Sequence, residues 1–238
     1  MGDDRRLPSP VPGGQEDRKA PPTGRGAKFG WRWLAVLGGL AGLLAFGAGV
    51  PGMQGNGASP MRPKGSGLAG QLLVATDALS DPRFAHSVVY MLQHDGGGAM
   101  GLIINRPVGK TPLAKLLGEL GVNNQGISRD IRVHYGGPVD PGRGFTLHTS
   151  DYAIEGTQVV GEGIAVTVDP EILRDIGLGK GPRLALLAVG YAGWAPGQLE
   201  AEIKAGAWIA VPADEPLLFD EDYPTKWERA TARRMFNL

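Results

Sequence analysis

The sequence has no cysteine, so its chemistry cannot use a thiol nucleophile, a disulfide bond or a thiolate metal ligand. It also has no G-x-S-x-G element, the usual setting of a hydrolase serine. Its four histidines lack the HExxH spacing of a zinc protease, and we interpret them as structural. They are His86, His94, His134 and His148. Neither a metal nor a cofactor is therefore expected.

Long apolar runs are equally scarce, and residues 33–50 form the one run of that length without a charged side chain. A membrane-spanning helix needs about 20 residues, so this run is at the short end of the range. Basic residues precede it, so a genuine span would keep the N-terminus in the cytoplasm and export the rest. One alternative is a cleavable signal that ends at small residues near Ala45. The other is a start codon set too far upstream, with Met53 or Met61 as the true start. A real span would make the protein membrane-anchored.

Positive and negative charges are unevenly distributed along the chain, although the chain as a whole is formally neutral. Residues 1–65 contain 9 Lys and Arg against 4 Asp and Glu, a charge of +5, whereas residues 66–238 contain 15 against 20, a charge of −5. Affinity for nucleic acid comes largely from neutralising phosphates. Direct DNA binding by residues 66–238 is therefore disfavoured.

Composition divides the chain into four parts. Residues 1–32 are rich in Pro, Gly and charge, and we expect them to be disordered because they bury too little apolar surface. Residues 33–50 are the candidate anchor, and residues 51–65 read as a linker. Residues 66–238 read as one folded domain.

Within that domain, short apolar stretches alternate with helical patterns that begin at a proline and end at a glycine. Several strands follow one another without a helix between them. The pattern predicts an α/β fold of the mixed α+β type: a single domain with a strongly curved, barrel-like mixed β-sheet flanked by about four helices. The expected strands are residues 71–76, 87–94, 99–105, 131–135, 145–149, 163–168, 183–189 and 207–211, and the expected helices are 112–121, 170–177, 196–206 and 223–236.

Three blocks carry a family resemblance. They are the stretch from Gln71 to Pro107, the pair Tyr135-Gly136-Gly137-Pro138-Val139 and Arg143 to His148, and the pair Gly190 to Trp194 and Gly197 to Glu200. In this order they resemble the YqgE/AlgH family of bacterial proteins. The resemblance implies a compact domain built on a curved sheet, in a family linked to regulation of alginate production and often labelled as transcriptional regulators. It also implies a cytoplasmic protein, unless residues 33–50 are a real membrane span. It transfers no catalytic or ligand-binding residue to this chain.

The best candidate site combines three predicted loops rich in glycine and polar or aromatic side chains, as ligand clefts are. Arg106 and Arg143 could together grip an anionic group. Structural alternatives remain open: a plain turn at Gly136-Gly137, Trp194 in the core, and an Arg106 ion pair with a carboxylate such as Glu200. The candidate residues are Asn105, Arg106, Tyr135, Gly136, Gly137, Arg143, Tyr191, Trp194 and Gln198.

Three functions follow from these observations. The first is a regulatory or binding protein that acts through protein contacts or a small anionic ligand. The second is transcriptional control by direct DNA contact, which the charge disfavours. The third is an enzyme, hydrolase-like, that uses the loops of Arg106, Tyr135 and Arg143. We favour the first, because no recognisable nucleophile, base or metal set accompanies the third.

Overall fold

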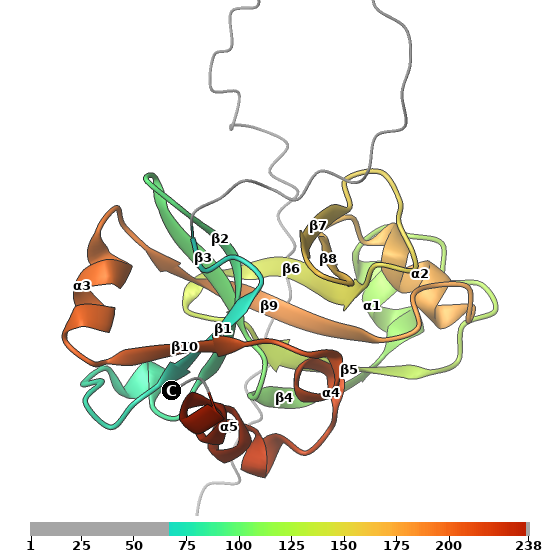
Figure 1. Ribbon diagram of the computed structural model, residues 1–238. Helices are drawn as coiled ribbons and strands as arrows, with labels where there is room; N and C mark the ends of the chain where they lie inside the picture. Colours follow the sequence, from blue (N-terminus) through green and yellow to red (C-terminus); the bar gives the residue numbers. More distant parts are fainter. Residues whose placement is uncertain (1–66, 237–238) are drawn as a thin grey trace, which may run out of the picture. The chain divides into compact units, whose positions relative to one another are not determined.

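The computed structural model describes residues 67–236, which form one curled β-sheet with helices packed against it (Figure 1). The predicted α/β fold of mixed type is confirmed. The expectations for residues 1–32, 33–50 and 51–65 fall outside the described residues. Within residues 67–236, no helix has the length and apolar character needed to cross a membrane.

The described residues contain ten strands and five α-helices, one helix more than predicted. The strands are β1 (Gln71–Ala75), β2 (Val88–Asp95), β3 (Gly98–Ile103), β4 (Pro107–Pro112), β5 (Asp130–Tyr135), β6 (Val139–Thr149), β7 (Gln158–Gly161), β8 (Ile164–Thr167), β9 (Ala185–Trp194) and β10 (Trp208–Pro212). The helices are α1 (Leu113–Glu119), α2 (Glu171–Gly177), α3 (Gln198–Lys204), α4 (Glu215–Phe219) and α5 (Tyr223–Ala232), with 3₁₀ turns η1 (Pro82–Phe84) and η2 (Arg233–Phe236).

The sheet runs in the order β10-β1-β2-β3-β9-β6-β8-β7, with β5 added to β9 and β4 added to β5. Among these strands only the β5–β9 pair is parallel, so the sheet is mixed but mainly antiparallel. It curls into a half-barrel (Figure 1). Strand β9 lies at its centre and pairs with β3, β5 and β6.

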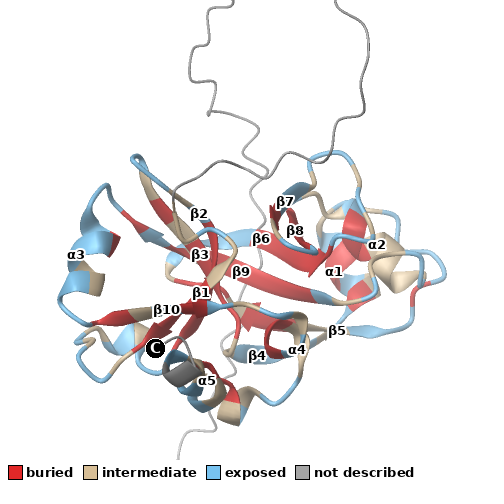
Figure 2. Ribbon diagram, in the orientation of Figure 1, coloured by how far each residue is buried: buried red, intermediate tan, exposed pale blue. Residues whose placement is uncertain are grey.

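In strands β1, β2 and β9 most side chains are buried (Figure 2). Alternate side chains of a strand point to opposite faces, so both faces of this part of the sheet are covered. In β1, Leu72 and Val74 enter one cluster together with residues of α4, whereas Leu73 and Ala75 enter another, which also contains Leu199 of α3. A third cluster joins α1 and α2 to β5 and β9. The helices therefore cover the sheet as separate groups, α4 and α5 on one face and α3, α1 and α2 on the other.

Two strands and one α-helix were not predicted. Strand β4 occupies a stretch that the sequence assigned to a loop and a helix start; it pairs only with β5, and its two prolines and Lys110 suit an edge strand. Strand β7 is a short edge strand whose Val159 is exposed. Helix α4 lies in the acidic stretch after Asp214, whose side chain accepts a hydrogen bond from the Leu217 backbone N–H at 2.9 Å and so caps the helix.

The link between β5 and β6 crosses over β9. Residues 187–189 of β9 pair with β5 on one edge and with β6 on the other, so residues 136–138 must pass from edge to edge. A Cβ on Gly137 would lie 2.1 Å from the carbonyl carbon of Tyr191, and one on Gly190 would lie 2.4 Å from the Gly137 carbonyl oxygen. Only glycine fits at either position, because the two backbones touch at the crossing.

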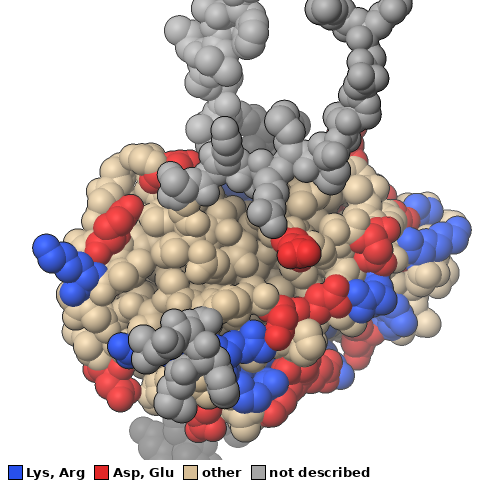
Figure 3. Space-filling view, viewed as in Figure 1, with Lys and Arg blue, Asp and Glu red and all other residues tan. Residues whose placement is uncertain are grey.

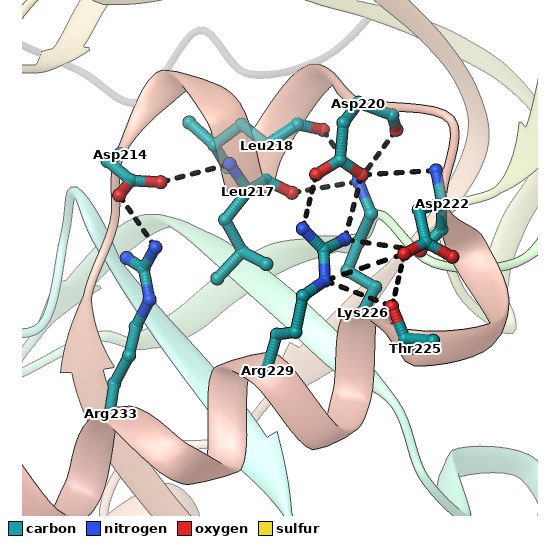
Figure 4. Close-up of polar contacts among 9 residues, drawn as sticks. All are labelled: Asp214, Leu217, Leu218, Asp220, Asp222, Thr225, Lys226, Arg229 and Arg233. Atoms are coloured by element: carbon teal, nitrogen blue, oxygen red, sulfur yellow. Dashed lines mark hydrogen bonds and ion pairs between the residues drawn. The ribbon is translucent and has the colours of Figure 1, made fainter.

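The C-terminal charge cluster, defined as Asp220, Lys226 and Arg229, fastens α5 to the end of α4 (Figure 4). The Lys226 side chain is fully buried, and its Nζ donates to the carbonyls of Leu217 at 2.8 Å and Asp220 at 3.0 Å. Nζ also lies 3.3 Å from the Asp220 carboxylate, which Arg229 grips with two hydrogen bonds of 2.6 and 2.9 Å. Acidic and basic side chains are interspersed along this side of the molecule (Figure 3).

Candidate functional site

The first predicted loop, Asn105 and Arg106, holds its neighbouring segment in place. The Asn105 side chain accepts from the Val88 N–H at 3.0 Å and donates to the His86 carbonyl at 2.8 Å. Arg106 donates Nη2 to the Ala85 carbonyl at 2.7 Å and Nη1 to the Arg83 carbonyl. Both side chains thus secure the turn that contains η1.

Arg106 does not form the ion pair with Glu200 that the sequence suggested. Glu200 instead binds the His94 ring, with 2.9 Å between Oε1 and Nε2, while the other nitrogen of that ring accepts from the Leu68 N–H. The pKa of Arg106 is lowered because the side chain is partly buried, an effect opposed by the nearby phenol of Tyr135. The Tyr135 backbone N–H donates to the Arg106 carbonyl at 2.9 Å, so these two residues lie side by side.

Four further predicted residues lie in the crossing over β9 or in the strands beside it. Gly136 and Gly137 make the crossing over β9, so they form a backbone contact and not an open loop. Tyr191 lies within β9, where the sequence predicted a loop, and its ring meets Phe145 edge to face at 6.0 Å. The Arg143 guanidinium lies over the Phe145 ring, 5.1 Å from its centroid. Phe145 belongs to the cluster with Leu72, on the face opposite that of Trp194.

Trp194 and Gln198 lie together in a hollow that we call the aromatic groove, with a volume of about 260 Å³. Its apolar walls are Phe84, Val139, Trp194 and Trp208, and its polar side chains are Asp81, Arg83, Gln198 and Glu202. A second, shallower hollow lined by Met100 and Tyr191 adjoins it and shares Val139, Gly193 and Trp194. Of the nine predicted residues, the structure thus brings Tyr191, Trp194 and Gln198 to one continuous surface.

The floor of the aromatic groove is a carboxylate bound by two indole rings. Oε2 of Glu202 accepts the Nε1 hydrogens of Trp194 at 2.9 Å and Trp208 at 2.8 Å, and Oε1 accepts from Gln198 Nε2 at 2.9 Å. The two indoles meet edge to face at 5.7 Å, and Phe84 lies 5.8 Å from Trp208. Trp194 is only 7% exposed, so it belongs to the core and to the groove at once.

Sequence reasoning missed Glu202, although one signal pointed to it. Gln198 and Glu202 are four residues apart on a predicted helix, a spacing that brings two side chains together. The tryptophans that complete the arrangement come from β9 and β10, and nothing local in the sequence joins them to α3.

The rim of the groove carries a tight ion pair. Arg83 binds both carboxylate oxygens of Asp81, with Nε at 3.1 Å from each and Nη2 at 2.7 Å from Oδ2. These hydrogen bonds lower the pKa of the Asp81 carboxyl. Together with Glu202, the charged side chains of the groove sum to −1, which favours a cationic group over an anionic one.

Comparison with known proteins agrees with the fold and with the resemblance described above. A family model described as AlgH-like matches residues 72–238. The chain belongs to the AlgH-like family. A UPF0301 protein of Rhodospirillum rubrum is 43% identical over 166 residues, which cover 70% of this chain and 86% of that protein. One of Bradyrhizobium diazoefficiens is 43% identical over 180 residues, covering 72% and 84%.

Two solved structures share the fold of this chain. The solution structure of the AlgH protein from Pseudomonas aeruginosa is 37% identical, with a TM-score of 0.60, over 75% of this chain and 92% of that one. A crystal structure of a Corynebacterium diphtheriae protein matches with a TM-score of 0.54 at 20% identity, over 73% and 90% of the two chains, and shows the fold alone. These comparisons establish the family, whose biochemical activity is not established.

Proposed function

We propose that this AlgH-like domain is a regulatory binding protein that docks a segment of a partner protein in the aromatic groove. The observation that carries this proposal is the pair of adjoining hollows that meet at Val139, Gly193 and Trp194. An extended segment can lie across both hollows. Val139 stands between them with 38% of its surface exposed.

The composition of the groove suits a protein partner. Protein interfaces concentrate their binding energy in buried aromatic and arginine side chains surrounded by a polar rim. Here the half-buried Phe84 and the exposed Val139 supply apolar surface over the buried Trp194, and Asp81 with Arg83 supplies the rim. The net charge of −1 favours a partner segment in which an apolar side chain is flanked by Lys or Arg.

A small anionic ligand, the other version of this function, has less support. It relied on Arg106 and Arg143 acting together. The Arg106 guanidinium is engaged by two backbone carbonyls, and Arg143 stacks on Phe145 on the opposite face from Trp194. The same separation weakens an active site built from these two arginines and Tyr135.

The experiment places a photoreactive amino acid at Val139 in the full chain and, as a matched control, at the exposed Val159 of β7. We expect position 139 to cross-link one protein that position 159 does not. The purified partner is then titrated against the variants Val139→Arg and Val159→Arg. A Kd raised at least about tenfold by the first and unchanged by the second is expected, since a basic side chain in the groove repels a basic segment. Equal affinity of both variants would refute the proposal.

A further inference from the structure

The described part of the chain begins next to the helix that lines the aromatic groove. The Leu68 backbone N–H donates to Nδ1 of His94 at 3.0 Å, and a Cβ on Gly67 would lie 2.3 Å from the His94 carbonyl oxygen. Nε2 of the same ring lies 2.9 Å from Oε1 of Glu200 in α3. Helix α3 also supplies Glu202 to the groove. The residues that precede Gly67 therefore join the domain beside α3.

Residues 31–34, with the sequence WRWL, have the composition that the groove favours in a partner, and we call them the WRWL segment. They hold both tryptophans of residues 1–66, one on either side of Arg32. Tryptophan and arginine are enriched among the side chains that contribute most of the binding energy at protein interfaces. Arg32 also carries a positive charge, which complements the charge of −1 in the groove. The WRWL segment thus matches the groove in both apolar surface and charge.

The chain is long enough to bring the WRWL segment to the groove. Between this segment and Gly67 lie 32 residues, which span roughly 100 Å when fully extended. The 170 described residues form a domain only about 40 Å across. Charge favours the same approach, because residues 1–65 carry +5 and residues 66–238 carry −5. A tethered segment also has a high local concentration, so a modest affinity is enough for it to occupy the groove.

We propose that the WRWL segment occupies the aromatic groove of its own chain and competes there with the partner protein. Its tryptophan rings pack against Phe84 and Val139, and Arg32 faces the carboxylates of Asp81 and Glu202. This inference rests on the proposed function, because it gives the same groove an internal occupant that a partner has to displace. Partner binding is then regulated by whatever holds or releases the segment.

Disulfide trapping tests this contact in the full chain, which has no cysteine of its own. Ala35→Cys, directly after the segment, is combined with Val139→Cys in the groove or with Val159→Cys on the exposed surface of β7. Val159 is a matched control, because β7 ends at Gly161, whose Cβ would lie 3.2 Å from the Gly70 Cα near the start of the domain. Proximity to the start of the domain alone would therefore trap position 159 as well.

Under a mild oxidant, the pair at 35 and 139 should form an intramolecular disulfide at least about tenfold faster than the pair at 35 and 159. Docking of the segment is the reason, since it holds residue 35 beside the groove. Intact mass and non-reducing gels measure the two rates. Equal rates, or disulfides that join two molecules only, would overturn the proposal.

A charge reversal separates docking in the groove from a general attraction between residues 1–65 and the domain. Arg32→Glu, added to the pair at 35 and 139, should slow the disulfide about tenfold, because it places a negative charge against Asp81 and Glu202. Arg6→Glu makes the same change of charge away from the tryptophans and should leave the rate nearly unchanged. Equal slowing by both variants would show that net charge alone acts, which also contradicts the proposal. Both substitutions lie outside the described domain, so its melting temperature should stay that of the parent protein.

The outcome can be told apart from that of the proposed function, because disulfide trapping needs no partner. Slow trapping, together with a protein cross-linked at position 139, would refute the internal occupant and keep the docking function. Fast trapping without any cross-linked protein would support the internal contact and refute the docking function. Where the partner has been purified, Arg32→Glu should lower its Kd several-fold, because the competing segment is weakened. An unchanged Kd would refute the competition.

Discussion

The C-terminal charge cluster and the aromatic groove each hold one charged side chain against the sheet, but they satisfy it differently. Lys226 is completely enclosed, and its three N–H bonds are directed at carbonyls and a carboxylate of α4 and the loop after it. Glu202 is half-buried, and its three hydrogen bonds leave room for a further one on Oε1. An enclosed charge stabilises the fold, whereas a charge with spare capacity at a surface hollow can also meet a partner.

The largest effect is expected at the enclosed charge. Lys226→Met should lower the free energy of unfolding by about 4 kcal/mol, because it strands the carbonyls of α4 and removes one partner of Asp220. Urea denaturation measures this loss. Lys204→Met, at the exposed end of α3, serves as the control and should leave the midpoint unchanged. A small effect of Lys226→Met would mean that its burial contributes little.

His134, which lies near the C-terminal charge cluster, predicts that the free energy of unfolding depends on pH. His134 is buried beside Tyr223, and its pKa is lowered from 6.5 to about 4 by burial, an effect only partly opposed by its hydrogen bond to the Leu187 carbonyl. Between these values the unfolded chain takes up a proton that the folded protein does not. Stability should therefore fall by about 3 kcal/mol as the pH decreases from 6.5 to 4.

His134→Phe tests this assignment, since it keeps the aromatic ring beside Tyr223 and removes the titrating group. Denaturation midpoints at several pH values should become flatter in this variant over that window. His86→Gln, at an exposed histidine, serves as the matched control. A slope that survives in His134→Phe would assign it to other groups.

Two arginines allow a second comparison between a charged side chain that is hydrogen-bonded to the backbone and one that is exposed to solvent. Arg106→Ala should cost about 2 kcal/mol, because it removes two charged hydrogen bonds to the carbonyls of Arg83 and Ala85. Arg143→Ala removes an exposed side chain that stacks on Phe145, and its unfolding midpoint should barely move. Parallel thermal and urea unfolding of the two variants makes the comparison. The reverse ranking would contradict the assignment.

The smallest effect is expected at the half-buried carboxylate. Glu202→Gln keeps an oxygen acceptor for the indole hydrogens, so it should cost only about 1 kcal/mol. The indole N–H signals of Trp194 and Trp208 should nevertheless shift in the NMR spectrum, because each loses a charged acceptor. Glu228→Gln, on the exposed side of α5, should move neither signal. If Glu202→Gln unfolds the protein, Glu202 belongs with Lys226 as an enclosed charge.

Much of the fold could be predicted because its signals are local. Alternating apolar residues mark β1 and β2, and prolines mark the starts of α2 and α3 within a residue or two. Strand β4 was missed because it ends directly at Pro112, where α1 begins as predicted, and because its pairing with β5 depends on a distant segment. The extension of β9 through Trp194 was missed because Gly190 and Gly193 suggest a loop.

The candidate site was predicted less well, for the same reason. Trp194 and Gln198 lie in the aromatic groove, but the groove also needs Glu202, Trp208 and the turn around Arg83, which three-dimensional packing alone brings together. Lys226 was not recognised either. On an amphipathic helix a lysine usually faces water, and only the carbonyls of α4 make its burial favourable.

The central position of β9 constrains the order in which the sheet can form during synthesis of the chain. Strands β3, β5 and β6 all pair with β9, which is synthesised after every one of them. A nascent chain that has reached Thr149 therefore carries strand edges without their central partner, and such edges invite aggregation. The sheet can therefore be completed only after residues 185–194 have been synthesised.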